Sequence, residues 1–227
     1  MDKILIIGGS RGIGRSIIDL IIEDAEIINL SRTAPEIEHR NLSHYEVDVT
    51  SDEIPLIEDV NKIIYCPGTI NLKPIHSLNI DDFIHDFNVN LLGAVKVFKT
   101  YARKLKRQEN ASILTFSTVA ANQGMPFHSS IAAAKGAMEG LTKSLAAELA
   151  PQVRVNCIAP SATNTPLAAH LFRNEKAIEN MKNRHPLRSI IESNDVAEMA
   201  AFLISNKAKA ITGQIIGVDA GLSNIKL

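Results

Sequence analysis

Apolar residues along the chain gather in short unbroken runs, which alternate with longer stretches where apolar positions recur every three or four residues. The short runs are typical of strands buried on both faces, and the longer stretches are typical of helices that bury one face. The pattern predicts seven strands, at 4–7, 25–30, 44–49, 62–66, 112–116, 153–159 and 214–218. It predicts helices from about residue 12, at 53–59, at 81–107, at 131–150 and from residue 194.

Strands and helices alternate through all 227 residues, and no internal repeat, low-complexity tract or linker interrupts them. Such an alternation is typical of a parallel sheet whose crossover helices pack on both faces. The composition suits one large core, because 45% of the residues are hydrophobic and 22% are charged. We therefore predict an α/β fold, a single doubly wound domain that spans residues 1–227.

The first predicted strand leads into a glycine-rich turn, G-G-S-R-G-I-G at 8–14. Glycines allow close approach of the backbone, and the free N–H groups at the start of the following helix attract an anion. A loop that merely joins a strand to a helix is the alternative. The strand predicted at 25–30 completes a β-α-β unit and favours a dinucleotide site. The candidate pyrophosphate-binding residues are therefore Gly8, Ser10, Arg11, Gly12, Ile13 and Gly14.

The residues after the second and third predicted strands discriminate between cofactors. In a dinucleotide fold an acidic residue after the second strand binds the adenosine ribose, whereas a cation there accommodates the 2′-phosphate of NADP. Ser31 and Arg32 stand at that place, and Arg11 could add a second positive charge. We therefore expect NADP (NADPH) rather than NAD, the alternative being that both arginines are solvated surface residues. Asp48 and Val49 end the third strand, where the carboxylate could meet the adenine amino group.

The charge balance and the cysteines narrow the partners and the compartment. A formal net charge of −1 gives no bulk attraction to nucleic acid or to an anionic membrane, so a small-molecule substrate is the default. No apolar run approaches ~18 residues, the length of a membrane-spanning helix. Cys66 and Cys157 lie far apart without metal-ligand spacing, which favours core thiols in a reducing compartment. We expect a cytoplasmic protein that binds no metal.

Several short motifs occur in a fixed order along the chain. They are I-G-G-S-R-G-I-G at 7–14, Y-C-P-G at 65–68, N-V-N-L-L-G at 88–93, P-S-A-T-N-T at 160–165, I-T-G-Q at 211–214 and V-D-A-G at 218–221. In this order the chain resembles the classical short-chain dehydrogenase/reductase family, especially its 3-oxoacyl-carrier-protein reductase-like members. Three motifs depart from the family pattern, because Ile7 replaces a threonine, Ser161 replaces a glycine, and Y-C-P-G replaces N-N-A-G.

The resemblance implies a Rossmann-type fold with a seven-stranded parallel sheet in the order 3-2-1-4-5-6-7. It also implies an oxidoreductase that interconverts a carbonyl group and a secondary alcohol by hydride transfer with a nicotinamide cofactor. The residues that the resemblance adds to the cofactor site are Gly68, Asn90, Lys135, Pro160, Thr163 and Thr165.

Family members use an asparagine, a serine, a tyrosine and a lysine in catalysis, with the tyrosine four residues before the lysine. The resemblance assigns three of these roles to Asn90, to Thr118 or the adjacent Ser117, and to Lys135. The tyrosine position falls on Ile131, which has no proton to transfer. General acid–base assistance is worth ~10²–10⁴-fold in rate, so we expect turnover to be impaired or atypical.

Two classes of function remain open. The first is an NADP(H)-dependent oxidoreductase, and the second is a catalytically silent NADP(H)-binding protein that serves as a sensor, scaffold or partner subunit. His128 lies three residues before Ile131 and could deliver a proton through water, or it could be an ordinary loop residue. A third interpretation is that Ile131 is an engineered substitution.

The segment 164–190, hereafter the lid segment, corresponds to the family's variable substrate lid. It carries Arg173, Lys176, Lys182, Arg184 and Arg188 against Glu175 and Glu179. An anionic substrate or carrier is one interpretation, and a solvated helix face is the other. The resemblance also implies self-association as a homotetramer or homodimer through the long helices predicted at 81–107 and 131–150.

Overall fold

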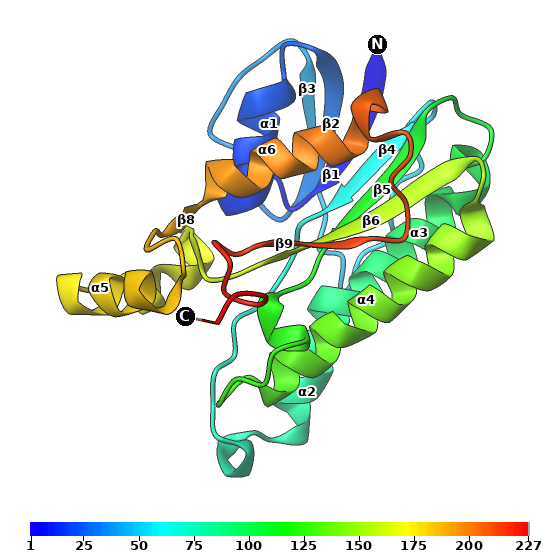
Figure 1. The fold of residues 1–227 in the computed structure, drawn as a ribbon. Helices are drawn as coiled ribbons and strands as arrows, with labels where there is room; N and C mark the ends of the chain where they lie inside the picture. The colour runs from blue at the N-terminus through cyan, green and yellow to red at the C-terminus, as the bar shows by residue number, and fades with distance from the viewer. Residues whose placement is uncertain (227) are drawn as a thin grey trace.

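The computed structural model describes residues 1–226 and is built on one seven-stranded parallel sheet (Figure 1). In spatial order its strands are β3 (Leu42–Glu46), β2 (Ala25–Ser31), β1 (Asp2–Ile7), β4 (Lys62–Tyr65), β5 (Ala111–Phe116), β6 (Val153–Pro160) and β9 (Ile215–Val218). The predicted fold and strand order are confirmed. The last strand of the sheet is the ninth in the chain, because β7 (Thr163–Asn164) and β8 (Ile191–Glu192) form a separate pair that the sequence did not predict.

Helices cover both faces of the sheet (Figure 1). On one face lie α1 (Gly12–Ile21) and α6 (Ser193–Ile204), and on the other lie α3 (Gly93–Leu105) and α4 (Ser129–Leu149). The remaining helices are α2 (Ile80–Phe87), α5 (Glu175–Arg184), the π-helical turn η2 (Asn88–Leu92) and the 3₁₀ segments η1 (Ile75–Ser77), η3 (Val119–Ala121), η4 (Pro166–Phe172) and η5 (Asn206–Ala208). No helix within residues 1–226 combines the length and the apolar character that crossing a membrane requires.

The central strand β1 shows why the apolar runs are unbroken. Its side chains alternate between the two faces, so Leu5 and Ile7 join the core under α3 and α4, while Ile4 and Ile6 join the core under α1 and α6. All four are almost fully buried. Fully burying one such side chain contributes ~1.5–3 kcal/mol, so both cores depend on this strand.

The helix predicted at 53–59 is wrong, because this segment is an extended loop. Its backbone groups bond to a side chain instead of forming a helix. The Tyr101 hydroxyl donates to Pro55 O at 2.7 Å and accepts from Ile57 N at 3.1 Å. Pro55 lacks an N–H donor, which disfavours a helix interior. Ile57 packs on the core even though the segment is not helical.

The single helix predicted at 81–107 is divided into α2, the π-helical turn η2 and α3. Two side-chain contacts accompany the wider turn: Asn90 Nδ2 donates to Asp86 O at 2.8 Å, and the Tyr65 hydroxyl donates to Val89 O at 2.6 Å. Single π-helical turns of this kind occur frequently at functional sites. The third strand is also shorter than predicted, ending at Glu46, because Asp48 instead accepts a hydrogen bond from Thr50 N at 2.8 Å in a local turn.

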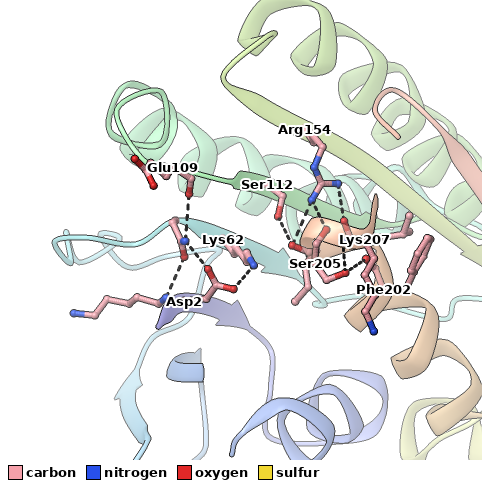
Figure 2. A network of polar contacts seen from close by, with 12 residues as sticks. Asp2, Lys62, Glu109, Ser112, Arg154, Phe202, Ser205 and Lys207 are labelled. Atoms are coloured by element: carbon pink, nitrogen blue, oxygen red, sulfur yellow. Dashed lines mark hydrogen bonds and ion pairs between the residues drawn. The ribbon is translucent and has the colours of Figure 1, made fainter. Parts of the chain in front are cut away.

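Polar contacts at the amino-terminal edge of the sheet join distant elements (Figure 2). Arg154 of β6 donates to carbonyl oxygens at the end of α6, at 2.7 Å to Leu203 O and 3.1 Å to Ser205 O. A cation at this place satisfies unpaired carbonyls and complements the negative end of the helix dipole. In the same view Lys62 of β4 pairs with Asp2 of β1. These contacts hold the edge opposite the candidate site.

Candidate active site

The glycine turn between β1 and α1 has the shape that the sequence predicted. Gly8 and Gly12 have φ angles of +79° and +55°, and a Cβ on Gly14 would overlap Gly8 O. Arg11 occupies the N-cap without a capping side chain among the described residues, and the first turn of α1 carries no acidic residue. The first N–H groups of α1 are therefore available to an anion, so the turn fits a dinucleotide pyrophosphate.

Asn29, which the sequence analysis did not single out, fixes this turn from the neighbouring strand. Its Oδ1 accepts from Gly9 N at 2.8 Å, and its Nδ2 lies 2.7 Å from Ser31 Oγ and 3.0 Å from His44 Nδ1. The side chain is fully buried within the apolar strand β2. A polar residue in an apolar run was the available signal, because buried amides in native proteins are hydrogen-bonded.

The residues that we expect to bind the adenosine part of the cofactor lie at or just after the ends of β2 and β3. Ser31 is buried and donates to Thr33 O at 2.9 Å, so its hydroxyl is committed to the loop. Arg32 is exposed, and no carboxylate of residues 1–226 forms an ion pair with it. Hydrogen bonds from Thr50, helped by the positive charge of Arg32, lower the pKa of Asp48. Val49 beside it is buried against Gly93, where a Cβ would overlap the valine side chain.

A cavity of about 230 Å³ lies at the carboxyl ends of the central strands. It opens next to the glycine turn, since Ile13 of α1 forms part of its wall. The other predicted site residues that line it are Gly68, Ser117, Thr118, Ile131, Lys135, Pro160, Thr163 and Thr165. The fold therefore brings these segments, which are far apart in the sequence, around one space at the edge where ligands bind in open α/β sheets.

Lys135 of α4 points toward the turn after β4. Its Nζ donates to Phe116 O at 2.9 Å, and a Cβ on Gly68 would lie 3.5 Å from Nζ and 3.3 Å from Asn90 Oδ1. Glycine at 68 therefore leaves room between the lysine and the asparagine. Burial lowers the pKa of Lys135 to about 8, partly offset by Cys157, Cys66 and Asp86. Asn90 itself is fully buried behind Gly68.

The two hydroxyl residues after β5 have different surroundings. Ser117 is buried, and its Oγ donates to Glu139 Oε1 of α4 at 2.7 Å. Thr118 is half-buried on the cavity wall, where its Oγ1 accepts from Ala120 N at 3.3 Å and keeps its own proton available. Glu139 also accepts two bonds from Asn122, at 3.0 and 2.8 Å, and so bonds to residues on both sides of η3. No local sequence pattern pointed to this carboxylate.

Ile131 is 5% exposed and forms part of the cavity wall on the same helix as Lys135. His128 lies just before α4 rather than within it, yet its ring also lines the cavity. His128 Nδ1 lies 2.7 Å from Pro126 O. A carbonyl oxygen only accepts, so Nδ1 carries the proton and Nε2 of the neutral ring is an acceptor.

Two buried polar groups near the cavity were not predicted. Asp86 is fully buried and accepts from Thr69 Oγ1 at 2.5 Å and from Ser130 Oγ, while Thr69 Oγ1 accepts from Asn90 Nδ2 at 2.7 Å. On the other side of the cavity, His185 Nε2 lies 2.8 Å from Ser161 Oγ. Burial lowers the pKa of His185, with a further contribution from Arg184. No local pattern marks a histidine inside a charged segment as buried.

Comparison with known proteins identifies relatives of this chain. A family model described as enoyl-(acyl carrier protein) reductase matches residues 56–223. Carbonyl reductase (NADPH) 2 of Sus scrofa is 27% identical over 96% of this chain and 95% of its own, and 3-oxoacyl-(acyl-carrier-protein) reductase of Thermotoga maritima is 30% identical over 96% of each chain. The ligand-free structure of Thermoplasma acidophilum aldohexose dehydrogenase superimposes with a TM-score of 0.88 and 29% identity, covering 100% of this chain and 97% of that one.

The fold, the glycine turn and the cavity define a nicotinamide-dependent oxidoreductase scaffold. The chain belongs to the short-chain dehydrogenase/reductase family.

Proposed function

We propose that this protein binds NADP(H) and interconverts a carbonyl group and a secondary alcohol of a small molecule, at a rate limited by Ile131. The observation that carries the proposal is the arrangement of Lys135, Gly68 and Thr118 around one cavity, with an apolar side chain where a proton donor is expected. The binding residues of the site are therefore retained, whereas its acid–base residue is absent.

When bound, the nicotinamide would supply or accept the hydride. In this proposal the Thr118 hydroxyl donates a hydrogen bond to the substrate oxygen, because its proton has no other commitment among the described residues. Lys135, charged at neutral pH with a pKa of about 8, binds the ribose hydroxyls and adds positive potential beside the reacting oxygen. Proton transfer to or from that oxygen depends on solvent, since Ile131 offers no exchangeable proton. The expected loss in rate is ~10²–10⁴-fold.

The preference for NADP over NAD is part of the proposal and rests on charge. Arg32 follows β2 without an ion-pair partner among residues 1–226, and Arg11 of the glycine turn is also exposed. Exposed guanidinium groups without an ion pair among the described residues would favour a 2′-phosphate on a ribose bound beside them. The name of the related reductase from Sus scrofa specifies NADPH, which supports the same choice.

A second candidate function is a catalytically silent NADP(H)-binding protein that acts as a sensor, scaffold or partner subunit. The surroundings of Ile131 favour it, because this apolar side chain is 5% exposed on the cavity wall and no tyrosine of residues 1–226 lines the cavity. The same cofactor residues serve both candidates, so only the measurement of turnover separates them.

Restoring the missing hydroxyl tests the proposal. NADPH oxidation is measured with a panel of ketones and 3-oxoacyl thioesters for the native protein, Ile131→Tyr and the matched control Ile131→Phe. We expect slow native turnover that rises by ~10²–10⁴-fold in Ile131→Tyr and not in Ile131→Phe. Turnover by Ile131→Tyr alone would favour the silent binder. Native activity equal to that of Ile131→Tyr would contradict the role given to Ile131, and failure to bind NADPH in a fluorescence titration would refute both candidates.

We also propose that the protein self-associates as a homotetramer or homodimer and works in the cytoplasm. Ile80, Ile84 and Leu92 support the assembly, because they are 74%, 51% and 48% exposed along α2 and η2. Exposed apolar side chains grouped on one surface are typical of protein interfaces. The two cysteines, which are both free, suit a reducing compartment.

A further inference from the structure

Many of the side chains that line the cavity are apolar. Side chains from separate segments form its walls, including Ile70, Leu72, Met125, Leu167, Leu171 and Met181. Three of these belong to the lid segment, where η4 and α5 pack over the space. A lining of this kind removes a hydrocarbon body from water, which favours a substrate with several apolar carbons.

The charges around the cavity are unbalanced. Its lining contains Lys135 and Arg184, and no aspartate or glutamate of the described chain contributes to it. Arg184 forms no ion pair with any carboxylate of residues 1–226. Within the described chain its Nη2 contacts Met125 Sδ, at 3.8 Å. A thioether is a weak acceptor, so the guanidinium keeps nearly all its hydrogen-bonding capacity for a ligand.

The neighbours of Arg184 distinguish it from an ordinary surface cation. The next residue, His185, is 1% exposed and bonded to Ser161, which anchors the end of α5 to the loop after β6. The backbone at residue 184 is therefore held at the edge of the cavity. Arg188, by contrast, donates to Asn183 O and Oδ1 at 3.1 and 2.7 Å and does not line this space. Of the five basic residues in the lid segment, all within the described chain, Arg184 alone lines it.

We infer that the substrate has an apolar body with an anionic group, a carboxylate or a phosphate, and that Arg184 binds this group at the mouth of the cavity. The inference rests on the proposed function, because it concerns the substrate of the same site. The arginine fork suits both anions, since two parallel N–H donors match two oxygens. The anion would lie at the lid, while the carbonyl or alcohol carbon reaches the inner wall formed by Thr118 and Lys135.

Unreactive probes test the inference independently of turnover. Octanoate, octyl phosphate and the neutral methyl octanoate are titrated calorimetrically into the full-length protein saturated with NADPH. We expect either anion to bind about tenfold more tightly than the ester, the size typical of one partly exposed charge-assisted hydrogen-bond pair. Octanoate and octyl phosphate together distinguish a carboxylate site from a phosphate site, and preference for either one supports the inference.

Arg184→Gln should reduce the preference for the anion to within about twofold, while Arg173→Gln, the same change elsewhere in the lid segment, should leave it unaltered. NADPH affinity is measured for each variant and confirms that its cofactor site is folded. Equal binding of the anions and the ester by the native protein, or a preference that survives Arg184→Gln, would overturn the inference. Loss of NADPH binding by the native protein would instead refute the proposed function, so the two failures are distinguishable.

Discussion

Ser117 donates a 2.7 Å hydrogen bond to Glu139, and this buried pair links the end of β5 to the middle of α4. The bond commits the proton of Ser117 to a structural contact. It leaves the neighbouring Thr118 as the hydroxyl that faces the cavity with its proton available. Both residues that the family resemblance leaves open for one role line the cavity, but only Thr118 keeps its hydroxyl proton free of a partner among the described residues.

Ser117→Ala should therefore mainly lower stability, whereas Thr118→Val should mainly lower activity. Ser117→Ala removes a hydrogen bond to a buried carboxylate and should lower the free energy of unfolding by ~1–3 kcal/mol in urea titrations. Thr118→Val loses only the 3.3 Å bond from Ala120 N at the start of η3, so it should lower the free energy of unfolding by no more than ~1 kcal/mol. Activity is compared by making each change separately in the Ile131→Tyr background, where Thr118→Val should reduce NADPH oxidation about tenfold. A larger loss of activity in Ser117→Ala than in Thr118→Val would contradict this assignment.

Lys135 should make stability depend on pH in a defined window. Burial lowers its pKa from 10.5 to about 8, so between these values the folded state binds fewer protons than the unfolded state. Stability therefore rises with pH across this window, by up to ~1.4 kcal/mol per pH unit. Below pH 8 both states are protonated, and the full cost of burying the ammonium group is present.

Lys135→Met isolates this effect, because tyrosines and cysteines titrate in both proteins. Urea unfolding at pH 7.5, 8.5 and 9.5 should show the stability of the native protein rising relative to Lys135→Met. A difference that stays constant with pH would show that the lysine is not desolvated. The same variant should bind NADPH more weakly, by about tenfold, because it loses a donor to the ribose.

Arg32 should control the choice between cofactors. Arg32→Gln removes the charge nearest the expected 2′-phosphate, so NADPH affinity should fall by about tenfold while NADH affinity stays unchanged. Fluorescence titration of both nucleotides measures the ratio, and Arg173→Gln in the lid segment serves as the matched control. An equal loss for the two nucleotides would mean that Arg32 does not read the 2′-phosphate.

The exposed isoleucines of α2 should matter for assembly. Ile84→Asp places a charge on an apolar surface and should convert the native oligomer into smaller species in sedimentation velocity. Leu56→Asp, at a residue that is 52% exposed in the loop before β4, is the control and should leave the oligomer intact. A native protein that sediments as a monomer would refute the proposed assembly.

The local pattern predicted strands and turns well, but it misjudged two helical regions. At 53–59 the apolar spacing resembles a helix, yet Tyr101 of α3 supplies the hydrogen bonds that this loop needs. At 81–107 the apolar spacing gives no sign of the π-helical turn at Asn88–Leu92, which Tyr65 and Asn90 stabilise by bonding to its backbone and to that of α2. In both cases the deciding partner is a side chain whose position depends on the completed fold.

The sequence by itself determined the parallel sheet, the glycine turn and the placement of Lys135 one helical turn after Ile131, because each depends on short-range spacing. Only the tertiary structure decided which polar side chains meet. Hydrogen bonds join Asn29 to Gly9, Glu139 to Ser117 and His185 to Ser161, across separations of 20 to 24 residues. Such pairs satisfy buried polar groups once the layers have packed. Their partners therefore follow from the geometry of the core, which the periodicity of a single segment does not encode.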